Sequence, residues 1–179
     1  MNCKPEIRIA DISDAAEVSR LLRSAMLTYC ADSGISSSML EAMTESIESV
    51  SDRIMNQTCL VAENNGKIVG TICIKPVPNP LVYSFSDISC EFLEKAGPSY
   101  YISRFAVEQR FRKTGLGIDL ITRALNIAHE AGAGCVLLHS AATNKNMVDF
   151  YGKRGFELID SESSRGYMRG LFANSSDRL

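Results

Sequence analysis

The chain has 179 residues, of which 45% are hydrophobic and 22% charged, and this length and composition predict one globular domain with a core of its own. A formal net charge of -2 gives no overall positive field, so binding to nucleic acid or to an anionic membrane is not expected. The N-terminal stretch lacks the apolar run of a signal peptide, and no segment approaches the roughly 20 apolar residues that cross a bilayer, so we expect a cytoplasmic protein.

The first two predicted elements are a short strand and a long helix. Residues 6–10 alternate polar and apolar side chains, as a half-buried strand does. Over residues 11–29 the apolar side chains recur at helical spacing instead, which predicts an amphipathic helix. Asp14 and Glu17 fit a capping box at the start of that helix.

A second helix is predicted over residues 40–54, where apolar side chains again recur every three or four positions. Four acidic residues fall together on another face of this helix: Glu41, Glu45, Glu48 and Asp52. They form either a solvated surface or part of a wall that attracts a cationic substrate.

Residues 58–77 predict a β-hairpin, because two apolar strands flank the sequence Asn64-Asn65-Gly66. These residues tolerate the positive φ angles that tight turns require. Residues 76–98 then have three prolines near their start, which favours a loop, with room for one or two helical turns over 89–97.

The second half of the chain alternates strands and helices. It predicts a buried strand over 100–107, a helix over 115–133, a strand over 134–141, a short helix over 144–154 that stops at Gly155, and a hairpin over 155–172. The order β, α, α, β, β, loop, β, α, β, α, β, β combines hairpin and crossover connections, without an internal repeat or a dividing linker. We therefore expect one α/β domain over residues 1–179, with a mixed sheet and helices on its faces.

Two closely spaced glycines mark the turn Arg112-Lys113-Thr114-Gly115-Leu116-Gly117, which leads from the buried strand into the long helix. Glycines let the backbone approach a ligand, and the amides, the helix dipole and the cations all favour an anion. The spacing is not that of a P-loop, and Leu120 occupies the third glycine position of a dinucleotide fold. The turn is either a phosphate or pyrophosphate site or an ordinary strand-to-helix turn with solvated cations.

The six cysteines and two histidines do not have the spacing of a metal or redox site. The cysteines contain no C-x-x-C pair, and Cys59 and Cys73 lie within apolar runs, where a thiol acts as a small hydrophobic side chain. His129 and His139 are too few for a histidine-rich centre. We expect no metal ion.

Two motifs together resemble the GNAT acetyltransferase superfamily. The sequence R-K-T-G-L-G matches the family signature R/Q-x-x-G-x-G/A, in its place between a strand and a helix. Downstream, Asn144, Phe150, Tyr151, Gly155 and Phe156 resemble N-x-x-A-x-x-L-Y-x-x-x-G-F. Residues 7–22 are also similar to the family's first strand and helix, and 166–171 to its last strand, so that 76–98 is the part not covered.

The resemblance implies a mixed central sheet that splays open between its fourth and fifth strands, and acetyl-CoA as the acyl donor. It implies that the amides of the turn hold the pyrophosphate: Arg112, Lys113, Thr114, Gly115, Leu116, Gly117 and Ile118. It implies that the pantetheine arm pairs with the end of the fourth strand: Phe105, Ala106 and Val107. Asn144 either hydrogen-bonds that arm or caps a helix. Many family members have glycine at the position of Lys113, of which only the amide is needed.

The resemblance also implies direct attack by an amine through a tetrahedral intermediate, with an oxyanion met by a backbone N–H near Val107. Tyr151 is expected to give a proton to the leaving thiolate, and the alternative is a tyrosine of the core. Many members carry a glutamate base on the fourth strand, where this chain has Ser103 and Arg104. A water chain to Glu108 or His139 is then the remaining route for the proton of the amine.

The expected function is transfer of an acetyl group from acetyl-CoA to a primary amine of a small molecule, an amino acid or a protein. The alternatives are transfer of another acyl group, or an acyl-CoA sensor or interaction domain without catalysis. In the family, the acceptor wall corresponds to residues 29–53 and 76–101, which carry few motifs. The expected partners are acetyl-CoA and the amine, with a homodimer left open.

Overall fold

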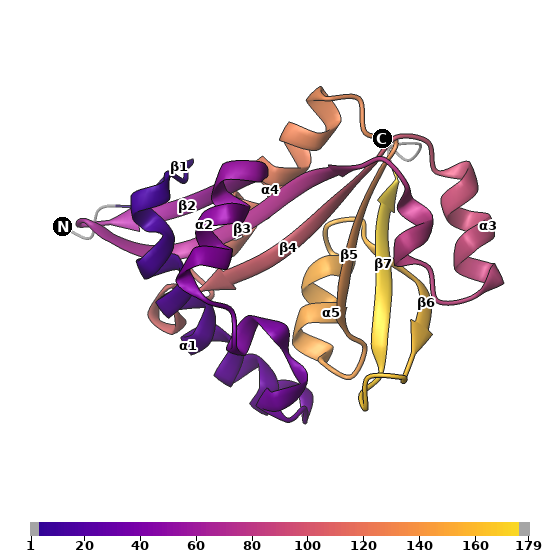
Figure 1. Cartoon of the computed structure of the whole chain (residues 1–179), viewed down its shortest axis with the longest axis horizontal. Coiled ribbons are helices and arrows are strands. Elements are labelled where there is room, and N and C mark those ends of the chain that lie inside the picture. The colour runs from indigo at the N-terminus through magenta and orange to yellow at the C-terminus, as the bar shows by residue number, and fades with distance from the viewer. Residues whose placement is uncertain (1–3, 176–179) are drawn as a thin grey trace.

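Within residues 4–175, which the computed structural model describes, the chain forms a seven-stranded mixed sheet in the order β1-β2-β3-β4-β5-β7-β6 (Figure 1). The strands are β1 (Glu6–Ile9), β2 (Thr58–Asn64), β3 (Lys67–Val77), β4 (Ser99–Val107), β5 (Cys135–Ala141), β6 (Glu157–Glu162) and β7 (Arg169–Ser175). Only β4 and β5 are parallel neighbours, and the other pairs are antiparallel. Cys3 and the last residues of the expected domain lie outside the described residues.

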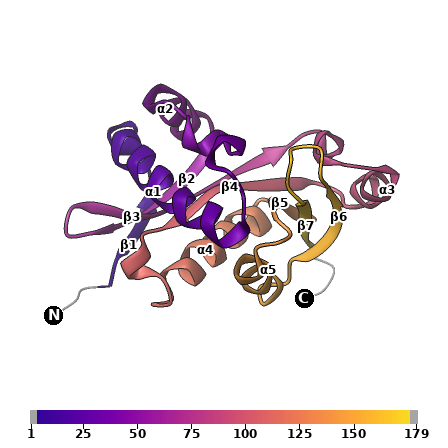
Figure 2. The ribbon, with the colours of Figure 1, turned by 90° about the horizontal axis from the view of Figure 1, so that it is seen from below.

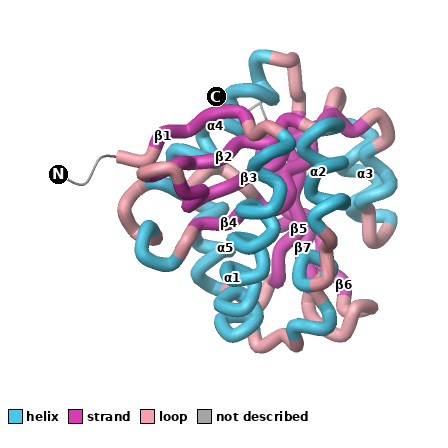
Figure 3. Tube along the Cα trace, turned by 60° about the vertical axis from the view of Figure 1, so that its left-hand side comes forward, coloured by secondary structure: helices cyan, strands magenta, loops and turns pink. Residues whose placement is uncertain are grey.

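Helices cover both faces of the sheet, as expected (Figures 2 and 3). They are α1 (Ala15–Ser33), α2 (Ile47–Asn56), α3 (Asp87–Lys95), α4 (Leu116–Glu130) and α5 (Lys145–Gly152). Helices α1 and α2 share one apolar core with β2 and β3, while α4 and α5 pack against the other face. Helix α3 packs on β5 and β7. None of these helices has the length and apolarity to cross a membrane.

The hairpin predicted over 58–77 is confirmed as β2 and β3. Its turn places Asn65 at φ 52° and Gly66 at φ 72°, the left-handed conformations that these residue types tolerate. Cys59 and Cys73 face each other across the two strands, each 2% exposed, with their sulfur atoms 2.7 Å apart. Both thiols therefore belong to the core, as expected. The segment 76–98 contains α3, which matches the one or two helical turns allowed there.

The second helix begins later than predicted. Helix α2 starts at Ile47, because the Ser46 hydroxyl accepts the Ser49 N–H and caps it there, while the preceding residues form short 3₁₀ turns. The acidic face expected from Glu41 to Asp52 is therefore not one helical face. Glu45 lies before the helix, and only 6% of its side chain is exposed. The interpretation of Glu45 as part of a solvated surface was wrong.

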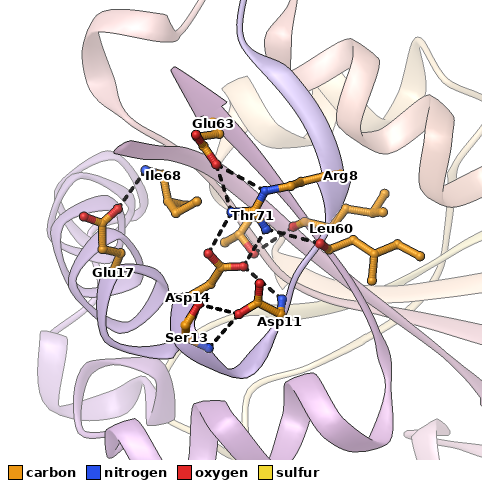
Figure 4. A network of polar contacts seen from close by, with 10 residues as sticks. Arg8, Asp11, Ser13, Asp14, Glu17, Leu60, Glu63, Ile68 and Thr71 are labelled. Carbon is orange, nitrogen blue, oxygen red and sulfur yellow. Dashed lines mark hydrogen bonds and ion pairs between the residues drawn. The ribbon is translucent and has the colours of Figure 1, made fainter. Parts of the chain in front are cut away.

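The capping box at the start of α1 also differs from the prediction (Figure 4). It is formed by Asp11 and Asp14 rather than by Asp14 and Glu17, because a 3₁₀ turn precedes the helix. The Asp14 carboxylate accepts hydrogen bonds at 2.7 and 2.8 Å from both terminal nitrogens of Arg8. The Glu17 carboxylate instead accepts the N–H of Ile68 at 2.8 Å. These three hydrogen bonds attach the start of α1 to the sheet.

The sheet opens between β4 and β5, as the family resemblance implied. The two strands pair only at Ser99 with Cys135, Tyr100 with Val136 and Tyr101 with Leu137. Beyond this seam β4 continues along β3 as far as Val107, and β5 continues along β7 to Ala141. Figure 1 shows the two strands diverging, with α5 beside the opening.

The Arg8–Asp14 pair should be a main anchor of the N-terminal strand. Asp14→Asn keeps the shape of the side chain but removes its charge, and we expect the free energy of unfolding to fall by about 1.5–3 kcal/mol. The hydrogen bonds from Arg8 lower the pKa of Asp14, so its contribution is present above the ordinary carboxyl pKa and is lost as the pH falls through the lowered one.

Urea unfolding at neutral and acidic pH measures this effect. The control is Lys145→Gln, which removes an exposed pair with Asp149 and should cost less than about 0.5 kcal/mol. Equal stability of the Asp14→Asn variant and the unmodified protein at pH 7 would contradict the assignment.

Candidate active site

The turn before α4 is an open backbone cradle. Lys113 and Gly115 have φ angles of 63° and 95°, the left-handed values that occur in backbone nests, where successive N–H groups face one anion. No side chain caps the helix at Gly115, and the first helical bond runs from Asp119 N–H to the Gly115 carbonyl. The amides of Leu116, Gly117 and Ile118 therefore lie at an uncapped helix N-terminus.

The charge around this turn is positive, which fits a phosphate group. The Nε of Arg112 donates a hydrogen bond to the Val107 carbonyl at 3.1 Å. The two terminal nitrogens of Arg112 make no hydrogen bond to the described residues. The side chain of Lys113 is exposed. Arg110 differs, because it pairs with Glu108 at 2.8 Å. The dipole of α4 adds about half a positive charge at the same place, so the residues present suit a pyrophosphate.

The left-handed φ of Lys113 gives a physical reason why glycine is usual there in the family. A residue with a Cβ pays about 1–2 kcal/mol for this conformation. At Gly117 the restriction is space instead, because a Cβ would approach the Phe105 ring to 3.3 Å. The choice of residue is thus limited by the backbone angle at position 113 and by packing at position 117.

The end of β4 offers a free strand edge to the opening. Ala106 and Val107 pair with Thr71 and Gly70 of β3 on one side, while no strand borders them on the β5 side. Phe105 turns its ring towards α5, where it stacks on Phe150 with centroids 5.6 Å apart. An amide-bearing ligand can satisfy the free backbone groups of such an edge as an added strand would.

A β-bulge precedes this free edge. Arg104 has a φ of 52°, and the register shifts from Cys73 opposite Ser103 to Thr71 opposite Ala106, so that β4 holds one extra residue. The left-handed conformation costs about 1–2 kcal/mol for a residue other than glycine. Some interaction must outweigh this cost.

The interaction is an ion pair with Glu45. Arg104 donates two hydrogen bonds to this carboxylate, at 3.0 Å from Nε and 3.2 Å from Nη2, and Arg53 of α2 donates another. Charge-assisted bonds of this kind contribute about 1.5–3 kcal/mol each, which exceeds the cost of the bulge. Burial would raise the pKa of Glu45, but the bonds from Arg53 and Arg104 prevail and lower it to about 2. Glu45 is thus a fixed negative charge and a poor base.

Tyr151 lies in the core beside the opening, 5% exposed. Its ring packs edge-on against Phe156 and tilted against Phe172. Burial raises the pKa of its phenol well above the usual range, and the phenols of Tyr29 and Tyr101 act in the same direction. The raised pKa keeps the phenol protonated, and its hydroxyl makes no hydrogen bond to the described residues.

Tyr29 joins the two sides of the opening. It projects from α1, and its hydroxyl accepts the Ala141 N–H at 2.6 Å and contacts the Ser140 hydroxyl at 3.2 Å on β5. Asn144 lies next to this bridge and caps α5, accepting the Met147 N–H at 3.1 Å and donating to the Ser33 hydroxyl at 2.9 Å. The capping role suggested for Asn144 is therefore present, while contact with a cofactor stays a prediction.

His139 is enclosed by aromatic rings and is not poised as a base. Its Nδ1 is 2.9 Å from the Tyr101 hydroxyl, its Nε2 is 3.3 Å from the Tyr83 carbonyl, and Phe85 lies beside the ring. Burial lowers the pKa of His139 to about 3, with the charge of Arg169 adding to the effect. Neutral imidazole with N–H on Nε2 satisfies both partners. Glu108, the other suggested proton acceptor, is paired with Arg110.

The structure brings together the turn, the end of β4 and Tyr151 around one opening, and it adds residues that sequence reasoning missed. Glu45 and Arg53 were not predicted as neighbours of Arg104, from which Glu45 is 59 positions away. The available signal was Arg104 itself, since a cation within a buried strand requires a partner. Among residues 4–175 no group of three metal-binding side chains occurs.

Comparison with known proteins identifies the family. The model of the acetyltransferase (GNAT) family matches residues 20–156, and the chain belongs to this family. The fold is similar to the PaiA N-acetyltransferase of Thermoplasma acidophilum, solved in complex with coenzyme A, at a TM-score of 0.76 and 19% identity, over 97% of this chain and 99% of that one.

Curated relatives agree with this result. The uncharacterized N-acetyltransferase YhfO of Bacillus subtilis is 28% identical over 153 residues, which cover 84% of this chain and 89% of the relative. N-alpha-acetyltransferase MAK3 of Arabidopsis thaliana is 29% identical over 100 residues, 56% of this chain and 45% of that protein. The match thus spans less than half of that N-alpha-acetyltransferase.

The surroundings of His139 predict an unusual titration. With a pKa near 3, its ring should stay neutral from pH 8 down to about pH 4. The unfolded chain takes up this proton near the ordinary pKa of about 6.5, so the group makes stability fall as the pH drops from about 6.5 towards 3.

Nitrogen-15 NMR of the ring atoms tests this prediction directly, because the sequence contains only two histidines. The variant His129→Gln assigns the signals. A His139 ring that titrates near pH 6.5 in the folded protein would contradict its enclosed position and return it to consideration as a base.

Proposed function

We propose that this protein is an N-acetyltransferase that transfers the acetyl group of acetyl-CoA to a primary amine. The main support is one arrangement: the nest of amides at the start of α4 lies beside the free edge of β4, where the sheet opens. A pyrophosphate joined to an amide-bearing arm requires these two features side by side.

Each predicted cofactor residue has a role in this proposal. The amides of residues 112–118 hold the pyrophosphate, with the charges of Arg112 and Lys113 near it, and the backbone of Phe105 to Val107 pairs with the pantetheine arm. Asn144 borders the arm from the start of α5. Relatives of the same fold provide context, since the yncA protein of Salmonella typhimurium was solved with acetyl-CoA, at a TM-score of 0.69.

In the proposed reaction the neutral amine attacks the thioester carbonyl, a C–N bond forms and the C–S bond breaks. A backbone N–H near Val107 stabilises the oxyanion of the tetrahedral intermediate. Tyr151 donates a hydrogen bond or a proton to the leaving sulfur. The proton of the attacking amine passes to solvent, because Glu45 and Glu108 are committed to arginines.

Because Glu45 and Glu108 both pair with arginines, we favour an acceptor that is readily deprotonated. An α-amine has a pKa of about 8, whereas a lysine-like amine has one of about 10.4, so a far larger fraction of the α-amine is neutral at pH 7.5. Peptides with a free N-terminus therefore come first in an acceptor screen, and the name of the N-alpha-acetyltransferase relatives points the same way.

A second candidate is an acyl-CoA sensor without turnover, and the same committed carboxylates support it. A third is an enzyme that transfers a different acyl group, because the turn is proposed to bind the pyrophosphate and does not contact the acyl chain. Release of free thiol, measured with acetyl-CoA and other acyl-CoA donors across a panel of amines, separates all three. Binding without thiol release from any pair would favour the sensor.

The glycine turn provides the sharpest binding test. Gly115→Val places a branched side chain at a φ of 95° and blocks the close approach of pyrophosphate, so we expect acetyl-CoA binding to be lost. Gly132→Val is a matched control at the other end of α4, because Gly132 also has a positive φ, of 82°, and open space around its Cβ position.

Both valine variants should lose similar stability, while only Gly115→Val should lose affinity in calorimetry. Unchanged affinity in a folded Gly115→Val variant would remove the turn from the binding site.

The role of Tyr151 is tested by Tyr151→Phe, which keeps the packing of the ring and removes the donor. We expect kcat to fall about 10- to 1000-fold with little change in acetyl-CoA affinity, since general acid catalysis typically contributes 10² to 10⁴ and water substitutes in part. Tyr100→Phe, on the paired part of β4, is the control. An unchanged kcat, with chemistry shown to be rate-limiting, would leave Tyr151 as a core residue only.

A further inference from the structure

The bulge at Arg104 decides which side chains of β4 face each layer of the molecule. Because of the extra residue, Ala106 lies opposite Thr71 and is buried in the α1/α2 core. Phe105 points to the other side, where it meets Phe150 of α5. In a regular strand paired at Cys73 and Ser103, Phe105 would lie opposite Thr71 instead, and every later residue would change face.

The same shift controls the backbone groups at the opening. Residues Phe105 to Val107 direct alternate N–H and C=O groups towards β3 and towards the free edge. A regular register would exchange these two sets. The groups that the proposed function uses to hold the pantetheine arm and the oxyanion would then point into the sheet.

The bulge is fixed from outside β4. The Glu45 carboxylate accepts hydrogen bonds from Nε and Nη2 of Arg104 and from Nη2 of Arg53. Only 6% of its side chain is exposed. The family resemblance suggested a base near this position, whereas Arg104 donates two hydrogen bonds to the Glu45 carboxylate. Glu45 belongs to the segment before α2, so a residue of the expected acceptor wall reaches the strand that binds the cofactor.

We propose that Glu45 and Arg104 are positioning residues for acyl transfer: their ion pair fixes the left-handed turn in β4 and thereby aims the backbone of Phe105 to Val107 at the thioester. Neither side chain touches the reacting atoms. This inference rests on the proposed acetyltransferase function.

Two substitutions at one position separate backbone conformation from charge. Arg104→Val lacks the guanidinium and strongly disfavours a positive φ, whereas Arg104→Gly lacks the guanidinium and adopts that φ readily. We expect Arg104→Val to lower kcat/KM for acetyl-CoA at least about 100-fold. Arg104→Gly should recover at least tenfold of this loss, although both variants lose the same ion pair.

Glu45→Gln tests the partner residue. We expect a loss of about 10- to 100-fold in kcat/KM, with weaker binding of the unreactive product CoA. The double variant Glu45→Gln/Arg104→Gln should be little worse than either single variant, because one pair is removed in each. Glu63→Gln is the matched control, since Glu63 also accepts hydrogen bonds from an arginine, Arg8, on the far edge of the sheet.

Equal activity of folded Arg104→Val and Arg104→Gly variants would overturn the proposal, as would wild-type kinetics in Glu45→Gln. If Arg104→Val does not fold, Arg104→Ala replaces it, because alanine pays a smaller penalty at positive φ. Affinity for CoA and hydrogen exchange of the β4 amides are measured on the same variants. These readouts test the positioning pair even if the unmodified protein acetylates no amine, an outcome that would count against the proposed function alone.

Discussion

The backbone of β4 beyond Tyr101 has no strand on its β5 side, and this gap in the hydrogen-bond ladder organises the rest of the molecule. Polar backbone groups inside a protein need partners, so the opening is a place of unmet hydrogen-bonding capacity at the centre of the sheet. The uncapped start of α4 adds further free amides at one end of it. Helices pack against both faces of the sheet around it.

Charge is distributed unevenly along this opening. At the end near α4, Arg112 and Lys113 form no ion pair with other residues of the described chain. On the side that faces α2, the charges of Glu45, Arg53 and Arg104 are paired with one another. Pairing with arginines thus engages the carboxylates of Glu45 and Glu108. This distribution is the basis of the proposal that the site binds an anion at one end and accepts an amine that loses its proton easily.

The sequence predicted the order of the strands and helices, because hydrophobic period and turn residues such as Asn65 and Gly66 are local signals. It also located the glycine turn. The opening itself was expected from the family resemblance and not from periodicity. Local patterns failed where a distant partner decides the structure. The acidic pattern placed Glu45 on the surface of a helix, whereas its side chain is enclosed beside Arg104 of β4. The environment of His139 is likewise set by Tyr83 and Tyr101, which are distant in the sequence. The start of α2 was missed because Ser46, and not the apolar period, sets it.

The seam between β4 and β5 joins the two halves of the sheet through three residue pairs, Ser99–Cys135, Tyr100–Val136 and Tyr101–Leu137. Farther along, the halves are held by side chains instead, since Tyr29 reaches Ser140 and Ala141, and Ser33 meets Thr143 and Asn144. Helix α1 therefore connects the two halves of the sheet across the opening between β4 and β5. Side-chain hydrogen bonds and the stack of Phe105 on Phe150 thus take the place of a strand ladder across this part of the sheet.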